Sequence, residues 1–182
     1  MEALTVVEIE QVRPEDHEAV TAVVGAAFVH QPEVPDLVRL IRDSPQYVAE
    51  LELVARVEGA VAGHTMISHA ALVDADGTRH DVLTLSPLSV APQHERQGIG
   101  SALVCEALAR AERTDAPLIL LEGSPAYYPR FGFTDARPHG ITFDLPDWSA
   151  PEAGMVYLLP RYDPAVRGRV DYPPAFATLG GH

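Results

Sequence analysis

Apolar and polar positions repeat along the chain with two periods, one typical of strands and one typical of helices. Alternation rich in β-branched residues predicts a first strand at residues 5–11, and Pro14 followed by two acids opens a helix after it. Polar clusters at Glu58-Gly59 and at residues 74–77 predict hairpin turns. In full, the expected strands cover residues 5–11, 47–57, 60–73, 80–90, 116–121, 140–145 and 155–159, and the expected helices cover residues 13–28, 34–42 and 101–110.

The length of 182 residues predicts a single domain with enough apolar residues for a proper core. Within it we separate a central motif region, residues 82–133, from a Pro-rich C-terminal part, residues 134–182. Residues 160–182 show little periodicity. The sequence leaves open whether this tail covers the sheet or a substrate cleft.

The strongest local pattern lies around Gln97-Gly98-Ile99-Gly100-Ser101. An apolar strand interrupted by Pro87 precedes it, and a segment of good helix formers follows. At 100° per residue, one stripe of that helix carries small or apolar residues, namely Gly100, Leu103, Val104, Ala107, Leu108 and Ala111. The segment therefore predicts a strand, a glycine-bearing turn and an amphipathic helix.

This arrangement suits a ligand that carries phosphate, because the first N–H groups of a helix have no partner within the helix and glycines leave them accessible. A nucleotide P-loop would need Gly-Lys-Ser/Thr, whereas Gly100 is followed by Ser101 and Ala102. A dinucleotide-binding turn would need a third glycine where Leu103 stands, although Glu122 lies near the position of a ribose-binding acid. An ordinary strand–helix junction, packed closely by its glycines, is the remaining alternative.

A second motif, Tyr127-Tyr128-Pro129-Arg130-Phe131-Gly132-Phe133, follows the next strand. Together with Pro87-Leu88-Ser89-Val90-Ala91-Pro92 and the segment from Arg96 to Leu103, it resembles the Gcn5-related N-acetyltransferase (GNAT) superfamily, and more closely its bacterial YhbS-type branch. The resemblance is strong over residues 82–133 and weaker elsewhere. It implies a mixed α/β fold, with a largely antiparallel central sheet, two parallel strands that splay apart, and helices on both faces.

The resemblance further implies that acetyl-CoA binds in the gap between the splayed strands. The main chain of Leu88, Ser89 and Val90 would pair with the pantetheine arm, and the loop at residues 95–101 would surround the pyrophosphate. The implied cofactor-binding residues are Leu88, Ser89, Val90, Glu95, Arg96, Gln97, Gly98, Ile99, Gly100, Ser101, Tyr127, Tyr128 and Phe131. Glu95 departs from the family, which usually has Gln or Arg there, and an acid beside a pyrophosphate predicts weakened binding.

The expected chemistry is direct acetyl transfer to an amine of a small molecule or peptide. Tyr128, protonated at neutral pH, would protonate the departing thiolate, and the backbone N–H of Val90 would stabilise the oxyanion. Tyr127 is an alternative acid.

The general base is left open between Glu122, Glu50, Glu52 and a solvent relay. The two N-terminal helices offer possible contacts to the acceptor at Phe28, His30, Leu37 and Ile41. A rival hypothesis is an acyl-CoA sensor without turnover, and another is an acetyltransferase acting on a protein N-terminus or lysine.

The composition restricts the classes of molecule that the protein is expected to bind. A formal charge of −13 and a pI near 4.9 argue against nucleic-acid binding and are compatible with a cationic acceptor. We expect a cytoplasmic protein, because no signal peptide or membrane span is recognised and the one cysteine, Cys105, fits a reducing compartment. Cys105 lies off the apolar stripe and has no paired histidine. Histidines 64, 69, 80 and 94 match no metal-ligand spacing, so we expect no metal. The oligomeric state stays open, a homodimer included.

Overall fold

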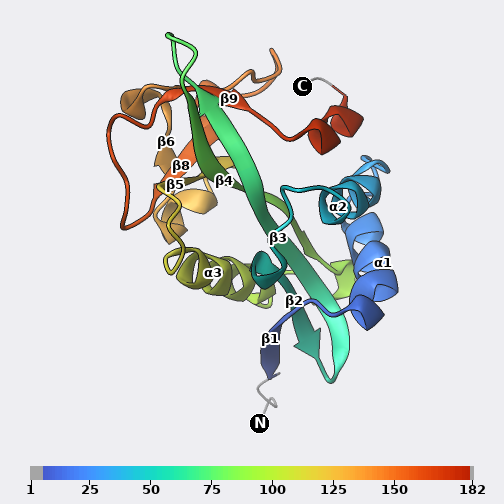
Figure 1. Cartoon of the computed structure of the whole chain (residues 1–182). Coiled ribbons are helices and arrows are strands. Elements are labelled where there is room, and N and C mark those ends of the chain that lie inside the picture. Colours follow the sequence, from blue (N-terminus) through green and yellow to red (C-terminus); the bar gives the residue numbers. More distant parts are fainter. Residues whose placement is uncertain (1–5, 181–182) are drawn as a thin grey trace.

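The computed structural model describes residues 6–180, which form a twisted sheet with helices on both faces (Figure 1). The strands are β1 Val7–Gln11, β2 Glu52–Val57, β3 Ala60–Val73, β4 Arg79–Val90, β5 Leu118–Glu122, β6 Thr134–Asp135, β7 Ile141–Thr142, β8 Gly154–Leu158 and β9 Gly168–Asp171. The α-helices are α1 His17–Ala27, α2 Val34–Arg42 and α3 Ile99–Ala111. Short 3₁₀ helices are η1 Pro14–Asp16, η2 Ala49–Leu51, η3 Pro92–His94, η4 Tyr128–Phe131, η5 Arg137–His139, η6 Pro151–Ala153 and η7 Pro174–Leu179.

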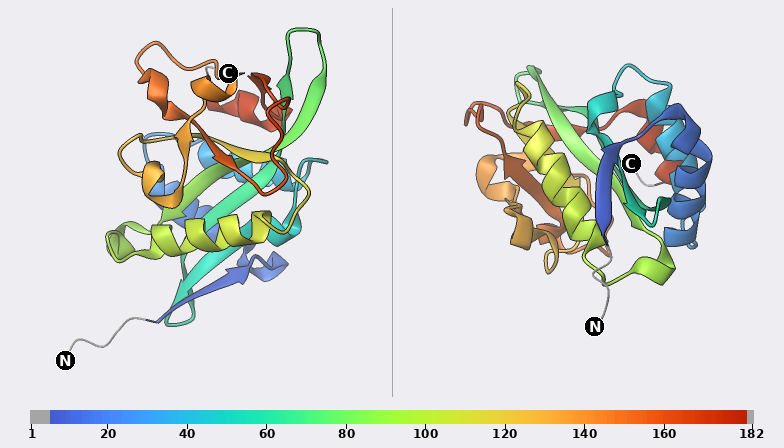
Figure 2. Two further views of the ribbon diagram at one scale, coloured as in Figure 1. Left: turned by 90° about the vertical axis from the view of Figure 1, so that its left-hand side faces the viewer. Right: turned by 90° about the horizontal axis from the view of Figure 1, so that it is seen from below.

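The sheet is mixed and largely antiparallel, as the sequence predicts. Its strand order is β1-β2-β3-β4-β5-β8-β6, and β9 pairs with both β3 and β7. Within the described residues, only the β4–β5 and β7–β9 pairs are parallel. Helix α3 covers one face, and α1 and α2 cover the other, so each face of the sheet has its own apolar core (Figure 2).

The predicted stripe of α3 faces the sheet. Its buried residues are Ile99, Leu103, Val104, Ala107, Leu108 and Ala111, while Gly100 lies half-buried at the edge and Cys105 is exposed. Helix and sheet approach closely at Gly63 of β3, where a Cβ atom would lie 2.9 Å from the Leu103 Cδ1 atom. This contact anchors the first turn of α3 against β3.

Several element boundaries differ from the sequence-based expectation. The strand expected at residues 47–57 begins only at Glu52, because η2 precedes it. The strand expected at residues 140–145 shrinks to two residues, and Thr5 lies outside the described residues. The prediction that residues 155–159 form the last strand was wrong, because β9 follows in the tail.

Strand β9 depends on long-range pairing rather than on its own periodicity. It pairs with β3 from Ala71↔Asp171 to Val73↔Arg169. At Gly168, φ is +130° and a Cβ atom would clash with the Val73 carbonyl group, so a glycine is needed where the tail meets the sheet. The tail then continues into η7, which packs beside α2 (Figure 1).

Candidate active site

Strands β4 and β5 diverge after a short parallel contact. Their pairing is limited to Leu83↔Ile119 and Thr84↔Leu120, although β4 continues to Val90 and β5 continues to Glu122. Among residues 6–180, no strand therefore pairs with this edge of β4 beyond Thr84. This is the splay that the sequence resemblance implies.

The open edge of β4 presents two of the three residues predicted to contact the cofactor through their main chain. Ala91 donates its N–H to the Ala62 carbonyl oxygen at 2.8 Å. Because bonded and non-bonded pairs alternate in an antiparallel ladder, Ser89 is bonded to β3, whereas Leu88 and Val90 turn their N–H and C=O groups away from it. The main-chain groups of Leu88 and Val90 are thus the ones directed into the gap.

The loop before α3 leaves the helix N-terminus accessible. Arg96 has φ +60° and Gly98 has φ +80°, and no side chain of the described part of the chain caps the first turn. Residues 95–98 are exposed, and a Cβ atom at Gly98 would meet no atom within 4 Å. The first N–H groups of α3, at the positive end of the helix dipole, are therefore accessible from the loop at residues 95–98.

The two adjacent tyrosines occupy different places. A Cβ atom at Gly100 would lie 3.2 Å from the Tyr127 hydroxyl, so Tyr127 reaches the beginning of α3, and Arg130 covers its ring with Cζ 4.4 Å from the centroid. The Tyr128 ring instead packs against Phe131 and Phe133 and lines a cavity at the splay. Burial, with a smaller contribution from Tyr127, raises the pKa of Tyr128 to about 12, so its hydroxyl is protonated at neutral pH.

The cavity at the splay has a volume of about 430 Å³. One wall comes from the diverging strands, with residues 84–88 and residues 121–123, and Tyr128 lies beside them. The opposite walls come from the connection between α1 and α2, from α2 itself, and from the Pro-rich C-terminal part, including the loop at residues 145–149 and η7. The size falls within the range of pockets that bind small molecules.

A family model for a GNAT acetyltransferase domain matches residues 8–136. The chain belongs to the GNAT acetyltransferase family. It is 28% identical over 99 residues to the uncharacterized N-acetyltransferase YjhQ of Escherichia coli K12, and this match spans 54% of each chain, about half the length of that relative.

Two solved structures extend the similarity across most of the chain. The GNAT family N-acetyltransferase YhbS of E. coli, in complex with CoA, has a TM-score of 0.85 and 26% identity, with 100% of this chain and 99% of that chain covered. A GNAT family acetyltransferase of Brucella melitensis, in complex with acetyl-CoA, has a TM-score of 0.75 and 27% identity over 94% and 99% of the two chains. The predicted GNAT fold and the likeness to YhbS are confirmed.

Of the carboxylates considered as the base of this GNAT protein, only Glu122 lines the cavity. It ends β5, opposite Gly154 of β8, and its charge contributes to a raised pKa of Tyr172, a tail residue that lines the same cavity. Glu50 is exposed on η2, away from the cavity.

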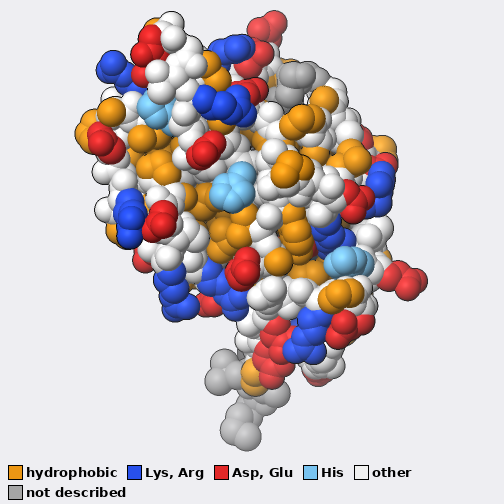
Figure 3. Space-filling view, viewed as in Figure 1, with side chains coloured by type: hydrophobic (Ala, Val, Ile, Leu, Met, Phe, Trp, Pro, Cys, Tyr) orange, Lys and Arg blue, Asp and Glu red, His pale blue; other side chains and the backbone are white. Residues whose placement is uncertain are grey.

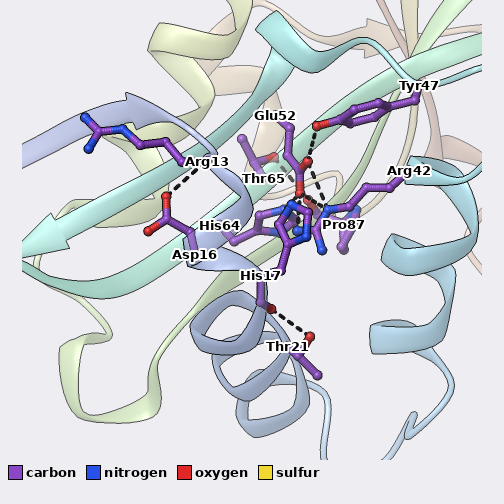
Figure 4. Close-up of polar contacts among 10 residues, drawn as sticks. All are labelled: Arg13, Asp16, His17, Thr21, Arg42, Tyr47, Glu52, His64, Thr65 and Pro87. Carbon is purple, nitrogen blue, oxygen red and sulfur yellow. Dashed lines mark hydrogen bonds and ion pairs between the residues drawn. The ribbon is translucent and has the colours of Figure 1, made fainter.

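Glu52 is fully buried on the α2 face of the sheet and belongs to a separate polar network (Figure 4). Arg42 donates two hydrogen bonds to Oε1, at 2.5 and 3.0 Å, the Tyr47 hydroxyl donates to Oε2 at 2.7 Å, and His64 Nε2 lies 2.9 Å from Oε1. Burial alone would raise the pKa of Glu52, but its hydrogen bonds with His64 and Arg42 lower the pKa to about 2. This carboxylate ties α2 to β2 and β3, and it does not face the cavity.

The cavity includes residues that the sequence did not single out. Of the four proposed acceptor contacts, Phe28 and Leu37 line it, whereas His30 is exposed elsewhere and Ile41 is buried in the core. The tail supplies Tyr172, Phe176, Leu179 and Gly180, and the preceding loop supplies Trp148. Aromatic residues in a Pro-rich tail were the available signal, but nothing local placed them at this site.

Other features of this GNAT chain lie apart from the cavity. Within residues 6–180, no cluster of three or more His, Cys, Asp or Glu side chains is arranged to hold a metal ion. None of the described helices is both long and apolar enough to cross a membrane. Acidic and basic side chains are interspersed over the face shown in Figure 3, where basic groups form no continuous patch.

Proposed function

We propose that the protein transfers the acetyl group of acetyl-CoA directly to the amino group of a small-molecule acceptor. The observation that carries this proposal is the cavity at the splay of β4 and β5, which places Tyr128 and Glu122 beside the open edge of β4. A solvent-accessible helix N-terminus lies beyond the end of the same strand. Together these features provide a cofactor groove that ends in an acid and a candidate base.

Acetyl-CoA would be held mainly by main-chain groups. Leu88 and Val90 offer the open edge of β4 to the pantetheine arm, and residues 95–101 offer the N–H groups at the start of α3 to the pyrophosphate. Tyr127, just before η4, and Phe131, at the end of η4, flank this region. Glu95 is exposed, so its side chain can turn toward solvent while the loop backbone binds.

The acceptor amine must lose protons during the reaction. Glu122, or water beside it, takes the first proton from the ammonium group and passes it to solvent, because an alkylammonium with a pKa near 10.4 is almost fully charged at neutral pH. The amine nitrogen then bonds to the thioester carbonyl carbon, and the Val90 N–H stabilises the resulting oxyanion.

Collapse of this adduct breaks the C–S bond. The nitrogen loses its second proton to the base, and Tyr128 gives its own proton to the departing thiolate and regains one from solvent. Within residues 6–180, no group hydrogen-bonds to the Tyr128 hydroxyl, which supports its availability to a ligand. The products are an amide and CoA thiol, with one proton released per charged amine.

The test has two stages on the purified protein. Calorimetric titration with acetyl-CoA should show binding at micromolar affinity, and a panel of amines should then release CoA thiol. Tyr128→Phe should lower kcat by roughly two orders of magnitude, the size expected for loss of a general acid, while acetyl-CoA affinity stays close to that of the unchanged protein. Tyr157→Phe is the matched control and should retain kcat, because the Tyr157 hydroxyl donates to Glu112 and does not line the cavity.

The outcomes separate the hypotheses. An unchanged kcat in Tyr128→Phe would move the acid role elsewhere. Binding of acetyl-CoA without turnover of any amine would favour the rival acyl-CoA sensor, and no binding of any CoA species would contradict both.

A further inference from the structure

The chemistry of the cavity walls restricts the acceptor. Among the described residues that line the cavity, Glu122 is the only one that carries a formal charge at neutral pH; none is Lys, Arg or His. The remaining polar contributors are neutral side chains such as Gln31, Ser86 and Ser149. A ligand carboxylate or phosphate would therefore lose water without gaining a cationic partner, and it would share the cavity with a like charge.

Glu122 shares the cavity with a residue from the far end of the chain, Tyr172. Burial, together with the negative charge of Glu122, raises the pKa of Tyr172 well above its ordinary value. The Tyr172 ring stacks on Phe176, with centroids 4.9 Å apart and planes 17° from parallel. A protonated, stacked tyrosine thus lines the same cavity as the carboxylate and interacts with its charge.

The wall around this carboxylate is apolar and in part aromatic. Phe28, Val34 and Leu37 contribute from the α1–α2 side, and Phe176 and Leu179 contribute from η7. Trp148 lines the cavity while 86% of its surface is exposed, so it stands at the rim with a free aromatic face. Such a wall can bury a hydrocarbon or aromatic group and stack on it.

We propose that the acceptor is a primary monoamine with a compact apolar or aromatic group and no anionic group. This inference rests on the acetyltransferase function proposed above. Its ammonium group binds the Glu122 carboxylate, its apolar group contacts the Phe28–Phe176 side of the cavity, and Tyr172 acts as a positioning residue for Glu122. The cavity therefore distinguishes an arylalkylamine from the amino acid that differs only by a carboxylate.

The first experiment compares matched acceptors by thiol release at saturating acetyl-CoA. The probes are 2-phenylethylamine, L-phenylalanine, putrescine and a short peptide with a free N-terminus. The kcat/KM for 2-phenylethylamine should exceed that for L-phenylalanine by roughly two orders of magnitude or more, because the carboxylate would be buried without a partner. Putrescine and the peptide should also be poor acceptors, because each carries an additional polar or charged group into the apolar wall.

The results distinguish this inference from the function on which it rests. Equal or preferential use of L-phenylalanine, putrescine or the peptide would overturn the inference and leave the acetyltransferase function standing. Acetyl-CoA binding with no turnover of any acceptor would contradict the function itself, and the inference with it.

A second experiment measures binding rather than turnover. Calorimetric titration of the CoA-saturated protein with 2-phenylethylamine and with its neutral analogue 2-phenylethanol separates recognition of the charge from packing of the ring. Glu122→Gln should weaken the binding of 2-phenylethylamine by about tenfold to a hundredfold, the size of a lost charge-assisted hydrogen bond. The affinity for 2-phenylethanol should stay nearly unchanged. Asp36→Asn is the control, because Asp36 is an exposed carboxylate on α2 outside the cavity. It makes the same change in net charge and should alter the affinity for neither ligand.

The role of Tyr172 is tested in the same assay. Tyr172→Phe retains the stacked ring but removes the hydroxyl group, so amine binding should weaken several-fold while alcohol binding is retained. In the Glu122→Gln background the tyrosine substitution should add little, because it acts through that carboxylate. Parallel losses for amine and alcohol, or full additivity of the two substitutions, would overturn the assignment.

Discussion

The ring of Tyr128 lies directly against the backbone of Gly123, so closely that a Cβ atom at position 123 would be 2.5 Å from Cε2. Gly123 follows the last residue of β5, and both residues line the cavity. The end of the strand therefore sets the position of the proposed acid, because Tyr128 can take this place only beside a residue without a side chain.

Gly123→Ala should displace Tyr128 and lower kcat by about tenfold or more, since a shift on the order of 1 Å at a catalytic group is costly. Acetyl-CoA affinity should change little. Steady-state kinetics of the amine reaction provide the measurement, with a thermal melt to confirm folding. In the Tyr128→Phe background the alanine should have almost no further effect on kcat. A second loss of the same size there would show that Gly123 acts by another route.

Gly98→Trp should block the accessible helix N-terminus and weaken acetyl-CoA binding by at least about tenfold, because a bulky side chain would cover the anion-binding N–H groups. Calorimetry gives the dissociation constant directly. Gly77→Trp is the matched control: Gly77 has φ +86° in a hairpin turn with no atoms near a Cβ, so it shares the backbone strain but not the site. Equal affinities in the two variants would argue against pyrophosphate binding at residues 95–101.

Glu95→Gln should strengthen acetyl-CoA binding by roughly twofold to fivefold at low salt, because it removes an exposed like charge beside the expected pyrophosphate. The gain should shrink as salt is added, since exposed charges are screened. Titrations at two ionic strengths measure both effects, and Glu18→Gln on α1 controls for the change in net charge. Tighter binding that persists at high salt would not fit this electrostatic explanation.

Acid should destabilise the fold in two steps. Burial lowers the pKa of His64 below 6.5, so the unfolded chain takes up a proton that the folded chain resists, and stability falls as the pH drops below about 6.5. The pKa of Glu52 is about 2 in the folded protein and 4.5 for an ordinary glutamate. Protonation of Glu52 should therefore cause a second loss of stability as the pH falls from 4.5 to about 2. Urea unfolding from pH 7.5 to 5 measures the first step.

His64→Asn should reduce the dependence of the unfolding free energy on pH between about 7.5 and 5. One proton changes the slope of the unfolding free energy by at most about 1.4 kcal/mol per pH unit, and the variant should lack that contribution whatever its absolute stability. The slope is the informative quantity, because His64 also contacts Glu52 and its loss destabilises the network at every pH. A slope identical to that of the unchanged protein would place the titrating group elsewhere.

The sequence predicted those elements that a few consecutive residues specify. The Gly98–Gly100 turn and the stripe of α3 each rest on a few consecutive residues, and in the structure the turn precedes a helix whose stripe packs in the core. The sequence could not choose among the carboxylates. Strand alternation shows which residues of β2 share a face with Glu52, but it does not show which face of the sheet that is. The residues that contact Glu52 and bury it lie on α2 and β3, far from it in the sequence.

The tail shows the same limit more clearly. Tyr172 and Phe176 reach the cavity only because β9 pairs with β3, about a hundred residues earlier in the chain, and four residues of strand leave no readable period. The separate locations of Tyr127 and Tyr128 were also inaccessible from sequence, because they depend on how η4 packs beside Gly100 and Gly123.

The wall supplied by the C-terminal part has a practical consequence for preparing the protein. Leu179 and Gly180 line the cavity, so a purification tag fused shortly after Gly180 would begin close to its wall and compete with the acceptor for space. A tag fused before β1 enters the chain at a strand that contributes no cavity residue. Acceptor screens are therefore best performed with amino-terminally tagged or untagged protein.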